Sequence, residues 1–245
     1  MKTLKEASHC WSTHKNTTRF WVGTDSQAQF EKNLQNLLYR EQLQRYGFDQ
    51  PTAISYEFNS HGFRCQEFDH GPGFIALGCS QTAGVGMPVD QIWPNLVSQQ
   101  LGLVCWNLAV GGASMDTCMR LLYHYIDLLN PRMVLLLRPA MARLEVFDHD
   151  TVRNLLPAKI ELPAFQKIWY SNDTNSQMNY IKNTLAIEQL CAQRQIPLVI
   201  KDAETDLLLY DRRPSAFPGA RDLQHAGPEE HRHCAELFIT ALNQN

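Results

Sequence analysis

The sequence predicts an α/β fold in which helices cover both faces of a parallel β-sheet. Short apolar runs alternate along the chain with longer segments whose apolar residues recur every three or four positions. The most apolar run, residues 133–137, contains no polar position, as expected of a parallel strand buried on both faces. In such sheets functional sites gather beyond the carboxyl ends of the strands.

Length and composition limit the range of functions. At 245 residues and 44% hydrophobic content, the chain can form one large domain with a sizeable core. We expect residues 1–50 to form an N-terminal arm and an amphipathic helix, and residues 51–245 to form the α/β domain. A formal net charge of -3 gives no electrostatic reason to expect nucleic acid or an anionic membrane as the partner. A small molecule or a glycan is the expected partner.

Cysteine usage and the lack of long apolar runs bear on the compartment. The seven cysteines are scattered without a CxxC pair, which indicates neither a disulfide framework nor a zinc ribbon. No stretch of about 18 apolar residues is present, and the N-terminus lacks the apolar centre of a signal peptide. We therefore expect a cytoplasmic protein without a membrane span.

The N-terminal part predicts few regular elements. Residues 1–25 are polar apart from three bulky anchors and predict a locally packed arm, whose function the sequence does not reveal. Residues 25–46 have apolar residues at helical spacing, which predicts one amphipathic helix packed on the outside of the domain and ended by Gly47. Residues 54–59 alternate apolar and polar and predict a strand that enters a turn at 60–64.

The rest of the chain alternates strands and helices. Strands are predicted at 73–77, 103–107, 133–137 and 196–200, and residues 207–210 form a short strand or a pocket wall, which makes about five strands. Helices are predicted at 90–101, with Asp90 as N-cap and Gly102 as C-cap, and at 116–129, 178–195 and 227–242. Residues 144–177 lack a regular period and are interpreted as an insertion near the substrate pocket.

A serine directly follows the first buried strand. Four apolar residues, 74–77, lead into Gly78, Cys79 and Ser80, which is how a strand delivers a nucleophile to a sheet edge. The alternative is an ordinary turn serine that caps a helix. A serine hydroxyl is a poor nucleophile near neutral pH unless an imidazole takes its proton, and a carboxylate fixes the tautomer of that imidazole.

His225 and Asp222 supply these two groups just before the last helix. The alternatives are a surface histidine and a capping aspartate. Glycines at 111 and 112 follow the second strand, where glycine lets backbone N–H groups approach a developing oxyanion. The N–H groups of Gly112 and Ser80 are the candidate donors, although a tight strand-to-helix turn would also account for the two glycines.

Three segments together resemble known sequence blocks. Gly78-Cys79-Ser80-Gln81-Thr82, Asn107-Leu108-Ala109-Val110-Gly111-Gly112 and Asp222-Leu223-Gln224-His225 resemble the first, second and fifth blocks of the SGNH (GDSL-type) hydrolase family. Asn59-Ser60-His61-Gly62-Phe63-Arg64 resembles a turn that precedes the serine block in some branches of that family. The resemblance covers residues 54–243 and depends on the order of the blocks.

The resemblance implies a flavodoxin-like three-layer α/β/α sandwich. It also implies hydrolysis or transfer of an O-acyl group without a metal or cofactor. By position, Ser80 would be the nucleophile, His225 the general base and Asp222 its orienting partner. Gly112 and the Ser80 backbone would form part of the oxyanion hole.

The chain departs from the family pattern at two places. Cys79 replaces the usual aspartate before the serine, at a position whose side chain performs no displacement. The third block, Gly-x-Asn-Asp, is replaced by residues 137–143, so Arg138 or Arg143 would supply a charged donor or bind an acidic group of the substrate. Arg138 is the preferred candidate, because it directly follows the most buried strand. Asn107 is a further substrate-binding candidate, with a loop-holding role as the alternative.

Other polar residues have simpler interpretations. Arg64, like most arginines, is expected to be solvated or paired. His231, His233 and Cys234 lie close in sequence, but on a helix they do not share one face, so a solvated helix surface is expected instead of a metal site.

The leading hypothesis is a serine esterase that removes a small O-acyl group, such as acetate from a carbohydrate. An O-acyltransferase would use the same residues and is the nearest alternative. A binding module that keeps the fold and holds a glycan or a partner without catalysis is the alternative from another class.

Overall fold

A parallel four-stranded sheet forms the centre of the computed structural model, which describes residues 8–69, 71–148, 151–156, 164–206 and 219–244. The strands are β3 (Gly73–Leu77), β4 (Val104–Asn107), β5 (Val134–Arg138) and β8 (Leu198–Asp202), in the spatial order β4-β3-β5-β8. Numbered along the chain, this order is 2-1-3-4, which matches the first four strands of the flavodoxin-like order. The expected α/β class is confirmed with four strands in the described part, and residues 207–210 lie outside it.

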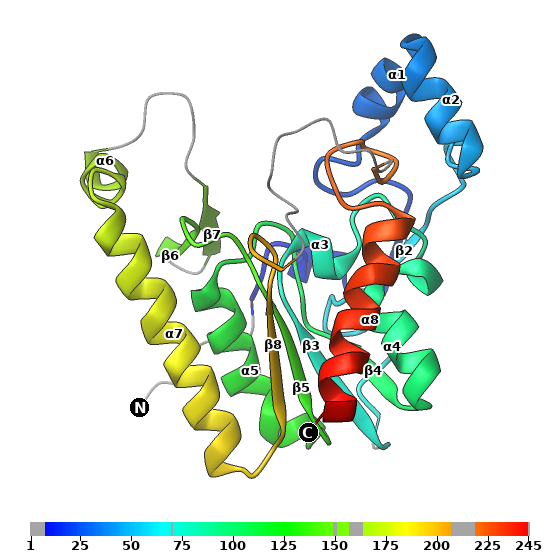
Figure 1. The fold of residues 1–245 in the computed structure, drawn as a ribbon. Coiled ribbons are helices and arrows are strands. Elements are labelled where there is room, and N and C mark those ends of the chain that lie inside the picture. Colours follow the sequence, from blue (N-terminus) through cyan, green and yellow to red (C-terminus); the bar gives the residue numbers. More distant parts are fainter. Residues whose placement is uncertain (1–7, 70, 149–150, 157–163, 207–218, 245) are drawn as a thin grey trace.

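Four long helices cover the two faces of the sheet: α4 (Trp93–Leu101), α5 (Met115–Leu129), α7 (Asp173–Gln193) and α8 (Pro228–Gln244). Successive side chains of a strand point to opposite faces. Accordingly, Ile75 and Leu77 of β3 join the apolar core that includes α5 and α7, whereas Phe74 and Ala76 join a second core with α4 and α8. The result is a three-layer α/β/α sandwich (Figure 1).

The ends of the core helices follow local capping chemistry. Gly102 ends α4 in the left-handed conformation, as expected from the sequence. Asp90 does not cap that helix, because it lies in the 3-10 turn η2 (Val89–Gln91) and Ile92 occupies the N-cap position. Ser114 begins α5 with a capping box that it shares with Thr117.

The N-terminal region differs from the single helix predicted at 25–46. It contains η1 (Ser12–His14), β1 (Thr18–Arg19), α1 (Gln27–Gln35) and α2 (Leu37–Arg45), and β1 pairs with β2 (Tyr56–Glu57) in an antiparallel ladder. Asn36 breaks the predicted helix because it is extended and its side chain caps α2. Leu37 and Leu38 are 63% and 72% exposed, so this helix pair stands away from the sheet instead of packing along it (Figure 1).

The predicted insertion contains regular structure. β6 (Leu144–Asp148) and β7 (Thr151–Leu155) form an antiparallel hairpin, and α6 (Ala164–Tyr170) follows. Helix α7 begins at Asp173, five positions before the predicted start at 178, with Asn172 as its N-cap. Arg120 of α5 holds the hairpin through two 2.7 Å hydrogen bonds to the carboxylate of Glu145.

Two chain-wide features complete the fold. None of the helices in the described ranges is both long and apolar enough to cross a membrane. No cysteine forms a disulfide, and all seven cysteines lie within the described ranges.

Candidate active site

The segment 78–87, here called the serine loop, follows the carboxyl end of β3. Ser80 is the first residue of the short helix α3 (Ser80–Ala83) and is 8% exposed. Its N–H lies in the first turn, where backbone donors have no partner within the helix. Gly78 is required here, because a Cβ at this position would lie 2.1 Å from the Oγ1 of Thr82. The sharp turn that presents Ser80 therefore depends on a glycine two positions earlier.

Arg64 holds the serine loop from beneath. Its guanidinium donates to the carbonyls of Ala83 at 3.3 Å, Gly84 at 2.6 Å and Met87 at 2.8 Å, and it stacks 4.2 Å from the centre of the Tyr56 ring. Arg64 is 1% exposed, and burial lowers its pKa to about 10, so it stays protonated at neutral pH. The expectation of a solvated or paired charge was wrong, because the partners of this arginine are backbone carbonyls.

The segment 219–227, here called the histidine loop, brings an imidazole and a carboxylate together. His225 Nδ1 lies 2.7 Å from Asp222 Oδ2. Asp222 Oδ1 accepts hydrogen bonds from the N–H groups of Gln224 at 3.0 Å and His225 at 3.2 Å. With Asp222 as acceptor, the neutral ring carries its proton on Nδ1 and presents Nε2 as an acceptor. This is the orientation that a general base requires.

Thr24 completes the environment of the Asp222 carboxylate. Its hydroxyl donates to Asp222 Oδ2 at 2.6 Å and lies 3.4 Å from His225 Nδ1. Burial by itself would raise the pKa of Asp222, but the hydrogen bond and charge of His225 and the hydrogen bond from Thr24 hold it below its ordinary value. Asp222 therefore remains a carboxylate near neutral pH and keeps its hydrogen bonds to the ring and the hydroxyl.

A buried ion pair attaches the N-terminal arm to the histidine loop. Arg221 donates to both carboxylate oxygens of Asp25, at 3.0 and 2.7 Å, and the two residues are 0% and 1% exposed. The guanidinium also stacks 4.1 Å from the centre of the Trp21 ring. Tyr56 donates to Asp25 Oδ2 at 2.5 Å and accepts from the Gly86 N–H at 2.7 Å, which extends the network to the serine loop.

The serine loop and the histidine loop are in direct contact. Gln81 Oε1 accepts from the Ala226 N–H at 2.9 Å, and Gly86 O accepts from the Arg221 N–H at 2.8 Å. Gln81 immediately follows Ser80, and Ala226 immediately follows His225. The first of these hydrogen bonds therefore joins the neighbours of the candidate nucleophile and the candidate base.

The segment 107–114, here called the glycine loop, follows β4. Gly112 has φ of +70°, a conformation that glycine adopts without strain. Asn107 is 1% exposed, and its amide donates to Thr82 O at 3.0 Å and accepts from the Ala109 N–H at 3.1 Å. These contacts match the loop-holding alternative for Asn107 and join the glycine loop to the serine loop.

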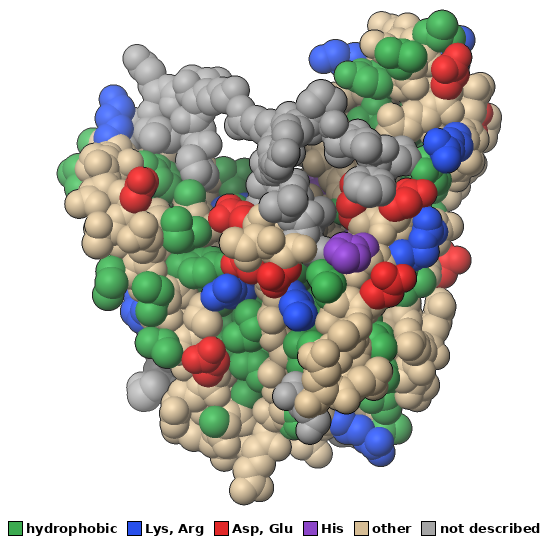
Figure 2. All heavy atoms as spheres, viewed as in Figure 1, with side chains coloured by type: hydrophobic (Ala, Val, Ile, Leu, Met, Phe, Trp, Pro, Cys, Tyr) green, Lys and Arg blue, Asp and Glu red, His purple; other side chains and the backbone are tan. Residues whose placement is uncertain are grey.

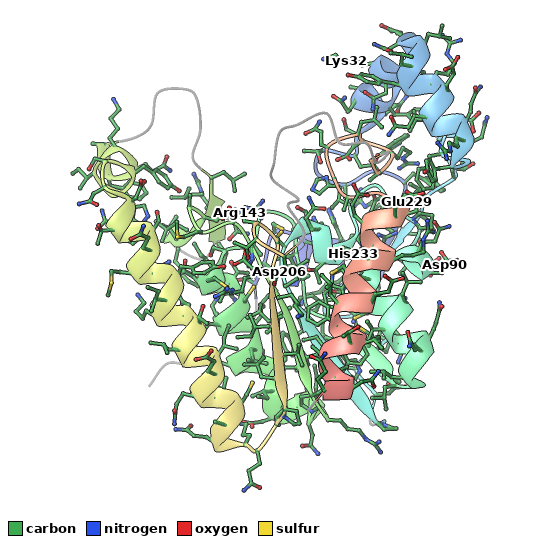
Figure 3. The ribbon with its side chains drawn as sticks, in the orientation of Figure 1. Lys32, Asp90, Arg143, Asp206, Glu229 and His233 are labelled. Atoms are coloured by element: carbon green, nitrogen blue, oxygen red, sulfur yellow. The ribbon has the colours of Figure 1, made fainter. Side chains whose placement is uncertain are left out.

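The two arginines after β5 have different surroundings. Arg138 forms a 3.1 Å ion pair with Asp202 and lies over the ring of Tyr180. Arg143 donates to the carbonyl of Ala113 in the glycine loop at 3.3 Å. Figure 3 shows Arg143 beyond the upper ends of the sheet strands. Of these two arginines, Arg143 is therefore the one that contacts the glycine loop, whereas Arg138 is paired with a carboxylate of β8.

Carboxylates gather near the carboxyl end of β8. The acidic side chains in the middle of the face in Figure 2 include the exposed Asp206, which Figure 3 labels. Asp206 accepts from the N–H of Asp202 at 2.7 Å, and Asp202 in turn accepts from the N–H groups of Glu204 and Thr205 at 2.8 and 3.1 Å. These carboxylates fix the turn that ends the strand.

The histidines of α8 do not form a metal site. The described residues contain no group of three side chains able to hold a metal ion. His233 is exposed on α8 (Figure 3), but His231 and Cys234 are each 2% exposed, so the expected solvated surface was wrong for those two. His231 Nδ1 accepts from the Trp93 N–H at 3.1 Å and thereby caps α4 from another helix.

Sequence reasoning missed three polar contacts of the site. Thr24, Gln81 and Asn154 touch the histidine loop or the glycine loop across 198, 145 and 43 positions of the chain, respectively. No local pattern marks such contacts. Of the three residues, only Gln81 lies inside a segment that resembles a family block, and this position was the one available sign that it belongs to the site.

Comparisons with known proteins give fold-level similarity only. No family model and no curated protein matches the chain. Among solved structures, it is similar to the psychrotrophic esterase EstA of Pseudoalteromonas sp., at 12% identity and a TM-score of 0.41, over 71% of this chain and 98% of that one. A carbohydrate esterase, described as having divergent catalytic and non-catalytic binding functions, is 12% identical with a TM-score of 0.41, over 72% of this chain and 70% of that one. A lipase/acylhydrolase of Enterococcus faecalis is 11% identical with a TM-score of 0.37, over 69% of this chain and 95% of that one. Similarity of this extent assigns neither a family nor an activity to the chain.

Proposed function

We propose that the chain is a serine-dependent ester hydrolase of the SGNH type. Ser80 Oγ attacks the ester carbonyl while His225 Nε2 takes its proton, and Asp222 stabilises the imidazolium. The N–H groups of Ser80 and Gly112 stabilise the oxyanion of the tetrahedral intermediate. His225 then returns the proton to the departing alcohol as its C–O bond breaks. Water attacks the acyl-enzyme by the same route and releases the acid.

One observation carries the proposal. The hydrogen-bonded carboxylate and imidazole of the histidine loop are fastened to the residue next to Ser80 through Gln81 and Ala226. A surface histidine beside a capping aspartate would not need a buried carboxylate with four hydrogen-bond donors around it. Asp222 has these donors in Thr24, Gln224 and both the backbone and the ring of His225.

An alkyl fluorophosphonate probe tests the activation of Ser80. Wild-type protein should form a covalent adduct on the peptide that contains Ser80, identified by mass spectrometry. Ser80→Ala should not react, and the matched variant Ser98→Ala should react like wild type, because Ser98 lies on α4 and bonds the carbonyl of Leu103. Folded, accessible wild-type protein that stays unlabelled would contradict the proposal and favour a binding module.

The proposed substrate is a small O-acyl ester, with acetate on a carbohydrate as the most specific candidate. Ser80 is only 8% exposed, which suits a small acyl group. A series of p-nitrophenyl esters of increasing chain length measures this directly. Highest kcat/KM on acetate would support the proposal, and a preference for long chains would contradict the acetyl substrate while leaving the serine mechanism in place.

Arg143 is the proposed contact for an acidic or hydroxyl-rich part of the substrate. A change confined to KM in Arg143→Ala would indicate binding of the ground state, whereas a loss in kcat would indicate stabilisation of the transition state. An O-acyltransferase remains the alternative activity, because an acceptor alcohol can take the place of water. Product analysis with added sugar acceptors separates transfer from hydrolysis.

The organisation of the chain belongs to the same proposal. We assign residues 51–245 to the hydrolase domain and residues 1–50 to an N-terminal extension that contributes to the site through Thr24 and Asp25. The seven cysteines without disulfides favour a reducing compartment such as the cytoplasm.

A further inference from the structure

The carbonyl of Gly111 is held from two sides by distant parts of the chain. Cys10 Sγ of the N-terminal arm donates to Gly111 O at 3.3 Å, and Asn154 Nδ2 of β7 donates to the same oxygen at 3.3 Å. The ring of Trp11 covers Gly111 as well, because a Cβ on that glycine would lie 3.3 Å from Trp11 Cζ2. Three residues from two separate segments thus fix one peptide group.

This peptide group also contains the Gly112 N–H. The C=O of residue 111 and the N–H of residue 112 lie in one planar trans unit and point in opposite directions. Donors fixed at the carbonyl therefore fix the direction of the N–H, which points away from the arm and the hairpin. A Gly-Gly peptide has little intrinsic preference to hold that orientation, because both residues lack a Cβ. The orientation must come from outside the loop.

The amide of Asn154 is itself fixed. Its NH2 group must face Gly111, because a carbonyl oxygen can only accept, and its Oδ1 then lies 3.0 Å from the Thr117 hydroxyl. The single proton of that hydroxyl is shared with the carboxylate of Glu145, which lies 2.8 Å away and is paired with Arg120. A Cβ on Gly112 would lie 3.6 Å from Asn154 Cβ, so the two residues are in contact. Side chains of α5 therefore hold the β6–β7 hairpin in place, and the hairpin in turn contacts the glycine loop through Asn154.

We propose that Asn154 is a positioning residue that, together with Cys10, orients the Gly111–Gly112 peptide so that the Gly112 N–H donates to the reaction oxyanion. This role rests on the proposed hydrolase function. Hydrogen bonds to the Gly111 carbonyl also polarise the peptide and strengthen the donor at its other end. The β6–β7 hairpin, outside the alternating core, thus contributes to catalysis without touching the substrate.

Kinetics on a p-nitrophenyl ester test this role. Loss of a complete oxyanion donor costs about 100-fold or more in kcat, so partial misorientation in Asn154→Ala should cost about 10-fold. KM should stay within about twofold, because ground-state binding does not depend on this N–H. The rate of fluorophosphonate labelling should fall by a similar factor, while the melting temperature changes little. Leu156→Ser, an exposed change just after β7, is the matched control and should leave kcat and labelling unchanged.

Variants of Cys10 give an independent measurement at an exposed position. Cys10→Ala should lower kcat about twofold to threefold, because a thiol is a weak donor, and Cys10→Ser should restore it, because a hydroxyl is a stronger one. The double variant Cys10→Ala/Asn154→Ala should lose more than the product of the two single losses, since each donor partly compensates for the other.

The outcomes separate this role from the proposed function. Wild-type protein that does not label on Ser80 would overturn the hydrolase and this role together. Wild-type protein that labels, with Asn154→Ala retaining full kcat, would overturn the positioning role alone. If Asn154→Ala fails to fold, equal kcat in wild type, Cys10→Ala and Cys10→Ser would overturn the shared orientation of the peptide.

Discussion

The histidine loop and the glycine loop are anchored by different chemistry. Buried, ionised partners hold the histidine loop: the Arg221–Asp25 pair is 0% and 1% exposed, and Asp222 is 1% exposed. Neutral donors hold the Gly111–Gly112 peptide of the glycine loop, with Cys10 and Asn154 each 3.3 Å from the Gly111 carbonyl. A full charge develops on the imidazole during the proposed reaction, whereas the glycine loop only aims an N–H. The buried ion pair therefore anchors the histidine loop, whose imidazole must carry a charge during the proposed reaction.

The largest expected effect comes from removing the charge of the histidine loop. Asp222→Asn keeps the shape of the side chain but no longer fixes the Nδ1–H tautomer of His225. We expect kcat to fall on the order of 10³-fold. Steady-state kinetics of the purified variant checks this. A loss of less than tenfold would show that catalysis does not need the Asp222 carboxylate. The proposed link between charged anchoring and the histidine loop would then be wrong.

The second largest effect is expected on stability, when the buried ion pair that anchors the histidine loop is broken. Arg221→Met leaves the carboxylate of Asp25 buried without its partner, which should lower the free energy of unfolding by about 3–5 kcal/mol. Urea unfolding followed by tryptophan fluorescence measures the change. Arg194→Met is the matched control, because its partner Asp127 is 73% exposed and the pair should contribute little. Equal effects of the two substitutions would contradict a structural role for the buried pair.

Acid should destabilise the fold through two buried histidines, His9 in the N-terminal arm and His231, which caps α4. Burial lowers the pKa of His9 to about 4 and that of His231 to about 3, and each ring accepts a backbone N–H on Nδ1. The unfolded chain, with histidine pKa values near 6.5, binds more protons below that pH. Each histidine should therefore cost up to about 1.4 kcal/mol of stability per pH unit as the pH falls from 6.5 towards 4. Urea midpoints across this range, compared with those of His9→Asn, measure the contribution of the arm.

The smallest effect expected at the histidine loop comes from a neutral contact. Thr24→Val removes the hydroxyl that donates to Asp222 but keeps its volume, so kcat should fall about tenfold with little loss of stability. Thr24→Ser should recover most of the rate. If Thr24→Val leaves kcat unchanged, the N-terminal arm supports the fold without adjusting the carboxylate.

Sequence patterns predicted the parts of the molecule that depend on neighbours along the chain. The strand at 73–77, with its four apolar residues, and the helix ended by Gly102 have local causes, and the structure contains both. The helix break at Asn36 also has a local cause, an asparagine cap, but the apolar spacing across it concealed the break. Where periodicity and capping disagreed, capping determined the structure.

Long-range polar contacts were not predictable in this way. The sequence around Arg64 gave no sign that this arginine is buried. Its partners are backbone carbonyls at the end of the short helix α3, which lies about 20 positions further along the chain. The order of Ser80, Asp222 and His225 was readable because each lies in a recognisable block. The contacts that orient them come from Thr24, Asp25 and the hairpin, in segments that carry no such pattern.

The bond between Thr24 and Asp222 spans 198 positions of the chain. During synthesis Thr24 therefore leaves the ribosome well before Asp222 is translated. A nascent chain can form β3 and present its serine before the carboxylate exists. Catalytic activity should therefore depend on docking of the arm against the histidine loop, and recovery of turnover after dilution from denaturant should lag behind recovery of helical circular dichroism.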